Sequence, residues 1–379
     1  MTGTRSVPIP SPRPRTSPAS RLPDFPWDTL AGVKATAAAH PGGIVDLSVG
    51  TPVDPVAEPI RRALYEGSAF PGYPATVGTP ALREAAAAAL TRRYGALELP
   101  GDAVLPVVGT KEAIAWLPTT LGLGAGDTVV IPELAYPTYE VGALLAGATP
   151  VRADGTAQLG PAPVALVFVN SPSNPTGKVL PAEHLRKVVD WARERGAIVA
   201  SDECYLGLAW DAEPVSVLDP RVSGGDPTGL IAIHSLSKTS NLASYRAGFL
   251  AGDPALIGEL TAVRKHAGLI MPFPVQAAMT YALSVDVHEA HQRERYARRR
   301  AALLAAVTGA GFRVDHSDAG LYLWATRGEP CRDTVAWFAE RGILVAPGEF
   351  YGPSGTEHVR IAMTATDERI AAAAERLAS

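Results

Sequence analysis

The 379-residue sequence contains only two cysteines, Cys204 and Cys331. It therefore lacks the paired cysteines of a disulfide framework and fits a reducing compartment. No apolar run approaches the about 18 residues of a membrane span. Positive and negative charges nearly balance, at a formal net charge of −4, which argues against a nucleic-acid surface. We expect a cytoplasmic protein that binds neither membrane nor nucleic acid.

Residues 1–20 lack the apolar core of a signal peptide and are rich in Pro, Ser, Thr and Arg. We expect a disordered leader there, with a basic targeting arm as the alternative. From 46 to 285, short apolar runs alternate with alanine-rich stretches, which predicts a large α/β domain with a mostly parallel sheet flanked by helices. The expected strands are 104–108, 128–131, 149–152, 164–169, 197–201, 230–234 and 246–251. The expected helices include 79–94, 111–117, 137–146 and 181–195.

Residues 286–379 show a different order of elements, which predicts a smaller α+β domain, and residues 21–45 are expected to pack with it. The expected elements are a charged helix at 288–308, a hairpin at 312–325, a helix at 331–341, strands at 343–345 and 358–362, and a final helix. We expect five arginines of the long helix to form a solvated face, with a phosphate-polymer site as the weaker alternative: Arg293, Arg295, Arg298, Arg299 and Arg300.

The segment 231–249 contains the strongest single candidate, Lys238. An apolar run ends in a polar loop that includes Ser235 and Ser237, and Arg246 follows eight residues after the lysine. Most lysines are solvated surface charges. A lysine placed among hydroxyl groups, near an arginine and in a segment fit for burial, suits an amine that bonds covalently to a carbonyl cofactor. The Ser and Arg side chains would hold an anionic group.

Further candidates follow predicted strands. Gly109, Thr110 and Lys111 end a strand and open a helix, whose free N–H groups and positive dipole end can hold a phosphate. Such junctions are also common without a ligand. Asn174 lies in a rigid turn at the end of a strand, where open α/β sheets bind ligands, although a plain turn is the alternative. Tyr136 offers a flat aromatic face and is otherwise a buried loop tyrosine.

Two charged residues are predicted in apolar strands. A buried carboxylate such as Asp202 at the end of a strand is energetically unfavourable unless it is paired with another group. The alternative is that Asp202 only caps the N-terminus of a helix. Arg360 in a late strand requires a carboxylate, from a ligand or from a structural salt bridge. Tyr73, in an exposed Gly-Tyr-Pro loop, is either an interface anchor or ordinary packing. Gly50 belongs to a Gly-Thr-Pro turn, and such a turn does not by itself indicate a functional site.

The motifs GTKE, PELAYPTY, NPTG, DECY, SLSK and RAGF follow one another over nearly the whole chain. In this order they resemble the class I/II aminotransferases, which have the fold type I architecture of pyridoxal phosphate (PLP) enzymes. The resemblance implies that Lys238 binds PLP and moves the substrate's α-proton, that Asp202 pairs with the ring nitrogen, and that Asn174 and Tyr205 contact the phenolic oxygen. It also implies phosphate contacts from Gly109, Thr110, Lys111, Ser235, Ser237 and Arg246.

The same resemblance gives the remaining candidates their roles. Tyr136 would stack on the ring, and Gly50, Asn174 and Arg360 would bind the substrate. Tyr73 would reach the cofactor phosphate of a partner subunit, which implies a homodimer with shared active sites. The expected kinetics are ping-pong through pyridoxamine phosphate, between small-molecule substrates such as glutamate and 2-oxoglutarate, and no metal is expected.

The segments FPWDTL, DLSVGTPVDP and ILVAPGEFYGP resemble the bacterial N-succinyldiaminopimelate aminotransferases of lysine and diaminopimelate biosynthesis. That resemblance implies glutamate as donor and N-succinyl-2-amino-6-oxopimelate, an amino-oxo dicarboxylate, as acceptor. Aspartate, aromatic or LL-diaminopimelate transamination are alternatives. A non-catalytic PLP-binding regulator is disfavoured because only about twenty polar residues precede the fold. Arg264 and Lys265 are candidates for binding the acceptor's distal carboxylates.

Overall fold

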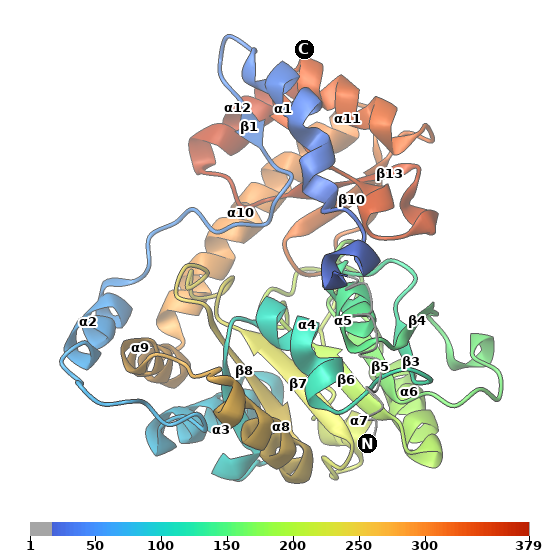
Figure 1. Ribbon diagram of the computed structural model, residues 1–379. Coiled ribbons are helices and arrows are strands. Elements are labelled where there is room, and N and C mark those ends of the chain that lie inside the picture. Colours follow the sequence, from blue (N-terminus) through green and yellow to red (C-terminus); the bar gives the residue numbers. More distant parts are fainter. Residues whose placement is uncertain (1–16, 379) are drawn as a thin grey trace, which may run out of the picture.

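The structure is a computed structural model that describes residues 17–378, so most of the predicted leader lies outside the described residues. A large domain is built on a seven-stranded sheet and a small domain on a four-stranded sheet (Figure 1). The strand order of the large sheet is β2-β8-β7-β6-β5-β3-β4, and only β8 runs antiparallel to its neighbours. Its strands are β2 (Val104–Val108), β3 (Thr128–Ile131), β4 (Thr149–Arg152), β5 (Leu166–Asn170), β6 (Ile198–Asp202), β7 (Leu230–Ser235) and β8 (Ala247–Gly252).

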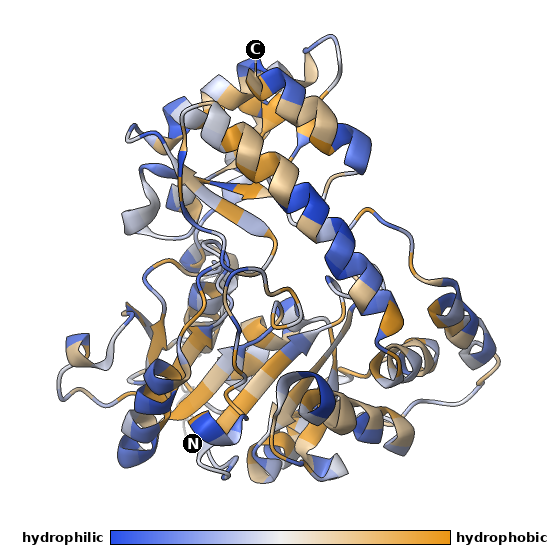
Figure 2. Ribbon diagram, turned by 180° about the vertical axis from the view of Figure 1, so that it is seen from behind, coloured by the Kyte–Doolittle hydropathy of each residue, from blue (hydrophilic) through white to orange (hydrophobic). Residues whose placement is uncertain are grey.

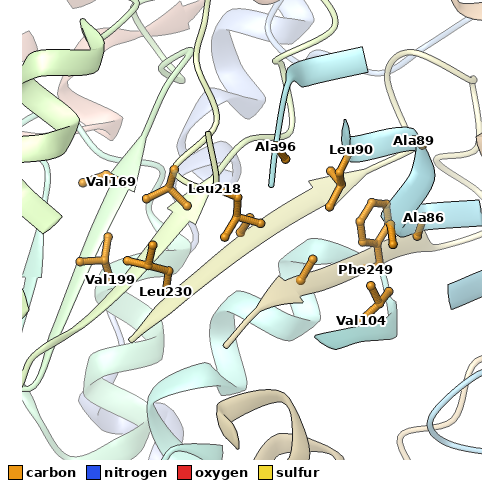
Figure 3. Packing of buried hydrophobic residues seen from close by; sticks show 14 of the residues in the cluster. Ala86, Ala89, Leu90, Ala96, Val104, Val169, Val199, Leu218, Leu230 and Phe249 are labelled. Carbon is orange, nitrogen blue, oxygen red and sulfur yellow. The ribbon is translucent and has the colours of Figure 1, made fainter. Parts of the chain in front are cut away.

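Helices cover both faces of the large sheet, which confirms the predicted α/β class. Successive strand residues face opposite sides. Val167 therefore packs in a core with α3, α6 and α9, while Phe168 packs in a second core with α4, α5 and α8. Figure 3 shows the first core, where Leu90 lies near Phe249. The helices are α2 (Glu58–Gly67), α3 (Pro80–Tyr94), α4 (Thr110–Thr120), α5 (Thr138–Ala146), α6 (Ala182–Arg195), α7 (Pro220–Ser223), α8 (Pro254–Ala267) and α9 (Phe273–Ser284).

The small domain has the sheet order β12-β13-β10-β9, with antiparallel neighbours. Near it, β1 of the N-terminal segment pairs with β11 in parallel, and Leu30 joins the small-domain core. The elements are α1 (Ala31–Ala38), β1 (Val45–Asp46), α10 (Val287–Gly309), β9 (Arg313–His316), β10 (Tyr322–Thr326), α11 (Cys331–Glu340), β11 (Ile343–Leu344), β12 (Ala346–Pro347), β13 (His358–Ala362) and α12 (Asp367–Ala378). None of the helices between residues 17 and 378 is long and apolar enough to cross a membrane.

The predicted solvated arginine face of α10 is wrong at Arg299. The half of α10 nearest the large domain is largely hydrophilic (Figure 2). Arg299 is nevertheless only 4 % exposed and donates hydrogen bonds to Asp54 and Asp367. Arg300 pairs with Asp211. Carboxylates from distant parts of the chain neutralise these arginines, so Arg299 attaches α10 to the segment between β1 and α2 and to α12.

Candidate active site

A cavity of about 550 Å³ lies between the carboxyl end of the large sheet and the small-domain sheet. Most of the residues predicted for the site line this cavity, although they come from both domains. The lining includes Gly50, Thr110, Lys111, Tyr136, Asn174, Asp202, Tyr205, Ser235, Ser237, Lys238, Arg246 and Arg360. Of the other two, Gly109 contacts the lining residue Arg246, whereas Tyr73 lies on the surface and is 99 % exposed.

Lys238 follows β7, and its ammonium donates a hydrogen bond to the carbonyl oxygen of Gly50. Burial lowers the pKa of Lys238, and the nearby cations Arg360 and Arg246 lower it further. The hydroxyl of Tyr322 and the thiol of Cys204 act in the opposite direction. A lowered pKa increases the neutral amine fraction, which is the form that attacks a carbonyl or accepts a proton.

Gly109 and Arg246 form a cradle at the start of α4. Gly109 has a φ of +81°, and a β-carbon at this position would overlap the guanidinium of Arg246. Arg246 itself has a φ of +56°, so it precedes β8 instead of opening it as predicted. Ser235, Ser237 and the first turn of α4 complete the lining. This set of hydroxyls, helix N–H groups and one guanidinium fits a phosphate group.

Asp202 is buried at the end of β6, and its hydrogen-bond donors within residues 17–378 are neutral groups. Its Oδ2 accepts from the Tyr139 hydroxyl at 2.7 Å, and its Oδ1 accepts from the Cys204 N–H at 3.2 Å. Burial raises the pKa of Asp202, while these donors and His234 lower it. A buried carboxylate that is not paired with a cation fits the protonated ring nitrogen of PLP. No capping role is seen, because no helix starts at Asp202.

Tyr139 was not predicted as a site residue, although it is the second tyrosine of the PELAYPTY segment. It lies in the first turn of α5, is fully buried, and stacks on Phe168 with ring centroids 4.8 Å apart. Tyr136, three residues earlier, contacts it edge-on at 5.8 Å and lines the cavity. Tyr136 precedes α5, so helical spacing gave no signal that both rings lie at the same site.

Arg360 lies on β13 and is 3 % exposed, yet no carboxylate among the described residues pairs with it. Its Nη1 donates to Asn174 Oδ1 at 2.8 Å, and its Nη2 donates to the Ser48 carbonyl at 2.6 Å. The Nε atom of Arg360 is buried and has no hydrogen-bond partner among the residues that the structure describes. Arg360 therefore forms no structural salt bridge within residues 17–378. A guanidinium held by neutral oxygens beside Lys238 is prepared to bind a carboxylate.

Tyr322 is a second residue that the sequence did not indicate. The guanidinium of Arg360 lies 4.1 Å from the centroid of its ring, and the hydroxyls of Tyr322 and Tyr205 are 3.0 Å apart. A β-carbon at Gly50 would overlap the Tyr322 hydroxyl. Burial and the neighbouring Tyr322 raise the pKa of Tyr205 well above its usual value, so Tyr205 stays a neutral hydrogen-bond donor.

The residues expected to bind a distal carboxylate do not lie in this cavity. Arg264 is buried, and its guanidinium donates two hydrogen bonds to Glu112, at 3.2 and 2.8 Å. The prediction for Arg264 is therefore wrong, because a carboxylate of α4 already pairs with it. Lys265 is exposed at the end of α8. The cavity's own additional cation is Lys111, whose ammonium lies 5.3 Å from the Phe25 ring centroid.

Comparisons with known proteins identify relatives over almost the whole chain. A probable aminotransferase of Mycobacterium tuberculosis is 69% identical over 95% of this chain and 86% of its own length. The 4-dedimethylamino-4-oxo-anhydrotetracycline transaminase OxyQ of Streptomyces rimosus is 60% identical over 94% of this chain and 99% of its own length. An LL-diaminopimelate aminotransferase of Desulforudis audaxviator is 32% identical over 94% of this chain and 95% of its own length.

Solved structures agree with the sequence comparisons. Substrate-bound BacF from Bacillus subtilis has a TM-score of 0.87 at 27% identity, covering 97% of this chain and 98% of that one. A Thermus thermophilus aspartate aminotransferase double mutant has a TM-score of 0.84 at 25% identity, covering 97% and 99%. The family profile "Aminotransferase class I and II" matches residues 43–377. The chain therefore belongs to the class I and II aminotransferases, a PLP-dependent family with the fold type I architecture.

Proposed function

We propose that this aminotransferase transfers the amino group of glutamate to N-succinyl-2-amino-6-oxopimelate in two half-reactions at one site. The observation that carries the proposal is the buried guanidinium of Arg360, whose only hydrogen-bond partners among the described residues are neutral oxygens. Both substrates carry an α-carboxylate beside the reacting carbon. One buried arginine can therefore orient either of them in the same way.

The side chains of the cavity have complementary tasks in the proposed reaction. When bound, PLP supplies an electron-withdrawing ring that stabilises the negative charge left on the substrate's α-carbon. Asp202, held by Tyr139, keeps the ring nitrogen protonated. The neutral amine of Lys238 takes the α-proton and returns it in the reverse half-reaction. Asn174 and Tyr205 would hold the ring's oxygen, and Tyr136 would contact the ring itself.

The mouth of the cavity contains a set of groups suited to the distal end of a long, acidic acceptor. Lys111 makes no ion pair with any residue between 17 and 378. The indole Nε1 of Trp27 is buried and has no hydrogen-bond partner in the described part of the chain, and its ring is 5.5 Å from that of Phe25. We therefore assign Lys111, instead of Arg264, to a distal carboxylate, with Phe25 and Trp27 contacting the chain of the acceptor.

A comparison of acceptors with glutamate as donor tests this assignment. The kcat/KM for the succinylated acceptor should exceed that for the unacylated acceptor, oxaloacetate and phenylpyruvate by at least about tenfold, or ~1.4 kcal/mol of transition-state binding. The variant Lys111→Gln should reduce this preference and leave phenylpyruvate almost unaffected. If Lys265→Gln removes the preference instead, the distal carboxylate is bound by the end of α8. If oxaloacetate or phenylpyruvate is the best acceptor, the proposed substrate is wrong.

A second candidate function comes from the relative that is named as an anhydrotetracycline transaminase. It shares 60% of its residues with this chain over 99% of its length. The exposed aromatic ring of Phe25, beside Trp27 at the cavity mouth, could contact a polycyclic ketone. A polycyclic ketone acceptor should therefore be included in the same assay. A kcat/KM above that of every dicarboxylate would favour this candidate.

We also propose that the enzyme is a cytoplasmic homodimer with shared active sites. Tyr73 is 99 % exposed, and Phe70 in the same loop stacks on Phe273 with ring centroids 4.1 Å apart. This ordered aromatic loop would place Tyr73 at the partner's site. Both cysteines are free thiols, as in a reducing compartment.

Mixing the variants Tyr73→Phe and Lys238→Ala tests the shared sites. If Tyr73 acts across the interface, a hybrid dimer has one site with both substitutions and one site with neither. Activity of the refolded mixture should therefore exceed that of both parent variants. Activity no greater than the average of the two parents would show that each subunit contains a complete site. Sedimentation measures the dimer fraction.

Replacing Gly109 by alanine should weaken PLP binding by about 10- to 100-fold, the effect of losing one charge-assisted hydrogen bond. The new β-carbon would displace Arg246 from the cradle. Gly122→Ala is the matched control, because Gly122 has a φ of +79° but nothing within 4 Å of a β-carbon. Absorbance titration of the cofactor-free protein measures both affinities. An equal loss of PLP affinity in the two variants would show that backbone strain alone causes the effect.

A further inference from the structure

A second and larger cavity, of about 650 Å³, lies behind the active site. We call it the rear cavity. Its large-domain wall contains Asn170, Ser173 and Thr176, which belong to the end of β5 and the turn that follows, together with residues of α6. Its small-domain wall contains Trp324 and His358. The rear cavity shares no lining residue with the active-site cavity in the described part of the chain.

The walls of the rear cavity are partly apolar. Trp191 and Val188 of α6 contribute an indole and an aliphatic side chain, and Leu180 and Leu159 add two more aliphatic groups. The volume is within the range of about 300–1,000 Å³ that is common for small-molecule sites. A flat aromatic group would therefore fit between Trp191 and the aliphatic side chains.

One lysine and two aspartates line the rear cavity, and the lysine is the group that can bind an anion. Lys178 is exposed and forms no ion pair within residues 17–378. Asp315 is paired with Arg313 and contacts His358, whereas Asp154 has a neutral backbone donor. Asp315 Oδ2 lies 2.8 Å from His358 Nε2, and Asp154 Oδ1 accepts from the Glu133 N–H at 2.9 Å. The unpaired ammonium therefore complements a ligand carboxylate.

Both walls of the rear cavity are attached directly to the site that binds the α-carboxylate. Asn170 Oδ1 accepts from the Asn174 N–H at 2.7 Å, and Asn170 Nδ2 donates to the Asp202 carbonyl at 2.9 Å. On the opposite wall, Trp324 is the antiparallel partner of Arg360. Trp324 also stacks on His358, with centroids 5.0 Å apart. A ligand that touches both walls would fix the relative positions of Asn174 and Arg360.

We propose that the rear cavity is an effector site for a small aromatic carboxylate, and that a bound effector tightens the binding of glutamate. The binding part of this proposal rests on the cavity alone, whereas the coupling part rests on the proposed role of Arg360. The effector would hold both walls in the arrangement in which Arg360 is hydrogen-bonded to Asn174. Glutamate would then bind to a site whose geometry is already fixed, which increases its affinity. By linkage, glutamate tightens the binding of the effector by the same factor.

Calorimetry on the PLP-loaded enzyme tests the proposal with indole-3-acetate, which has no α-amino or α-keto group and cannot be transaminated. It should bind at a stoichiometry of one per chain. A saturating mixture of glutamate and 2-oxoglutarate should tighten this binding by about fivefold, at the lower end of common coupling energies. Lys178→Gln should weaken it by about tenfold, and Leu180→Trp, which fills the cavity, should abolish it. Lys187→Gln, which removes an exposed α6 lysine paired with Glu183, should leave it unchanged.

The outcomes separate the two parts of the proposal. Displacement of indole-3-acetate by glutamate, with unchanged affinity in Lys178→Gln and Leu180→Trp, would place the probe at Arg360 and overturn the rear site. Absence of any heat of binding would also overturn it. Loss of binding in both variants without any effect of glutamate would retain the site and overturn the coupling, and with it the link to the proposed function. Thermal unfolding of Leu180→Trp checks that the variant is folded.

Discussion

Replacing Lys238 by alanine should lower turnover by about 10⁴-fold or more, since the variant loses the group that we propose as both nucleophile and proton-transferring base. Lys238 is partly buried in the cavity, and its lowered pKa increases the neutral fraction of the amine. Arg246 and Arg360 lower that pKa further, so the two cations proposed to hold phosphate and carboxylate also activate the lysine.

Borohydride reduction of the PLP-loaded enzyme, followed by peptide mass spectrometry, measures which amine carries the cofactor. The label should be found on Lys238 in the native enzyme. Lys111→Ala removes the other lysine of the cavity and should still be labelled at Lys238. A label on Lys111 in the native enzyme, or turnover by Lys238→Ala near that of the native enzyme, would contradict the assignment.

Most of the large sheet could be predicted because its signals are local. The run at 104–108 corresponds to β2, and 128–131 corresponds to β3, without any shift. Apolar residues of such strands are buried on both faces, so the whole run is hydrophobic and its ends are clear. The prediction failed at the start of β8, because the positive φ of Arg246 turns the chain there. A left-handed arginine is rare and has no signal in its own side chain.

Charge pairing between distant segments could not be predicted. Arg299 appeared to be one of five similar arginines, but its partner Asp54 is 245 residues away. Arg264 likewise pairs with Glu112, 152 residues away. The pattern of a helix indicates which residues share a face, and it does not indicate which carboxylate packs against that face. Both errors therefore concern arginines that the tertiary structure buries.

The site residues that follow strands were indicated by their positions, because the carboxyl ends of parallel strands lie at one edge of a sheet. Asn174 and Asp202 are examples, and both line the cavity. Tyr322 was missed because it comes from an antiparallel strand of the other domain and has no distinctive neighbours in sequence. It reaches the site only through domain packing, which also places Arg360 against its ring.

Replacing Arg360 by alanine should reduce kcat/KM for glutamate by roughly 30- to several-thousand-fold, the effect of losing ~2–5 kcal/mol from a buried bidentate partner. The same loss is expected for the acceptor, since we propose that this guanidinium binds both α-carboxylates. The variant also leaves Asn174 Oδ1 and the Ser48 carbonyl without their donor, so part of the loss comes from unpaired oxygens.

Arg360→Lys separates these contributions. An ammonium keeps the positive charge and can reach one of the two neutral oxygens, but it lacks the planar fork that binds a carboxylate through two parallel hydrogen bonds. It should therefore restore thermal stability more than it restores kcat/KM. PLP absorbance should be normal in both variants, because Arg360 does not belong to the Gly109 cradle. Activity of Arg360→Ala equal to that of the native enzyme would remove this residue from the site, whereas full recovery in Arg360→Lys would show that charge alone, without the fork, binds the carboxylate.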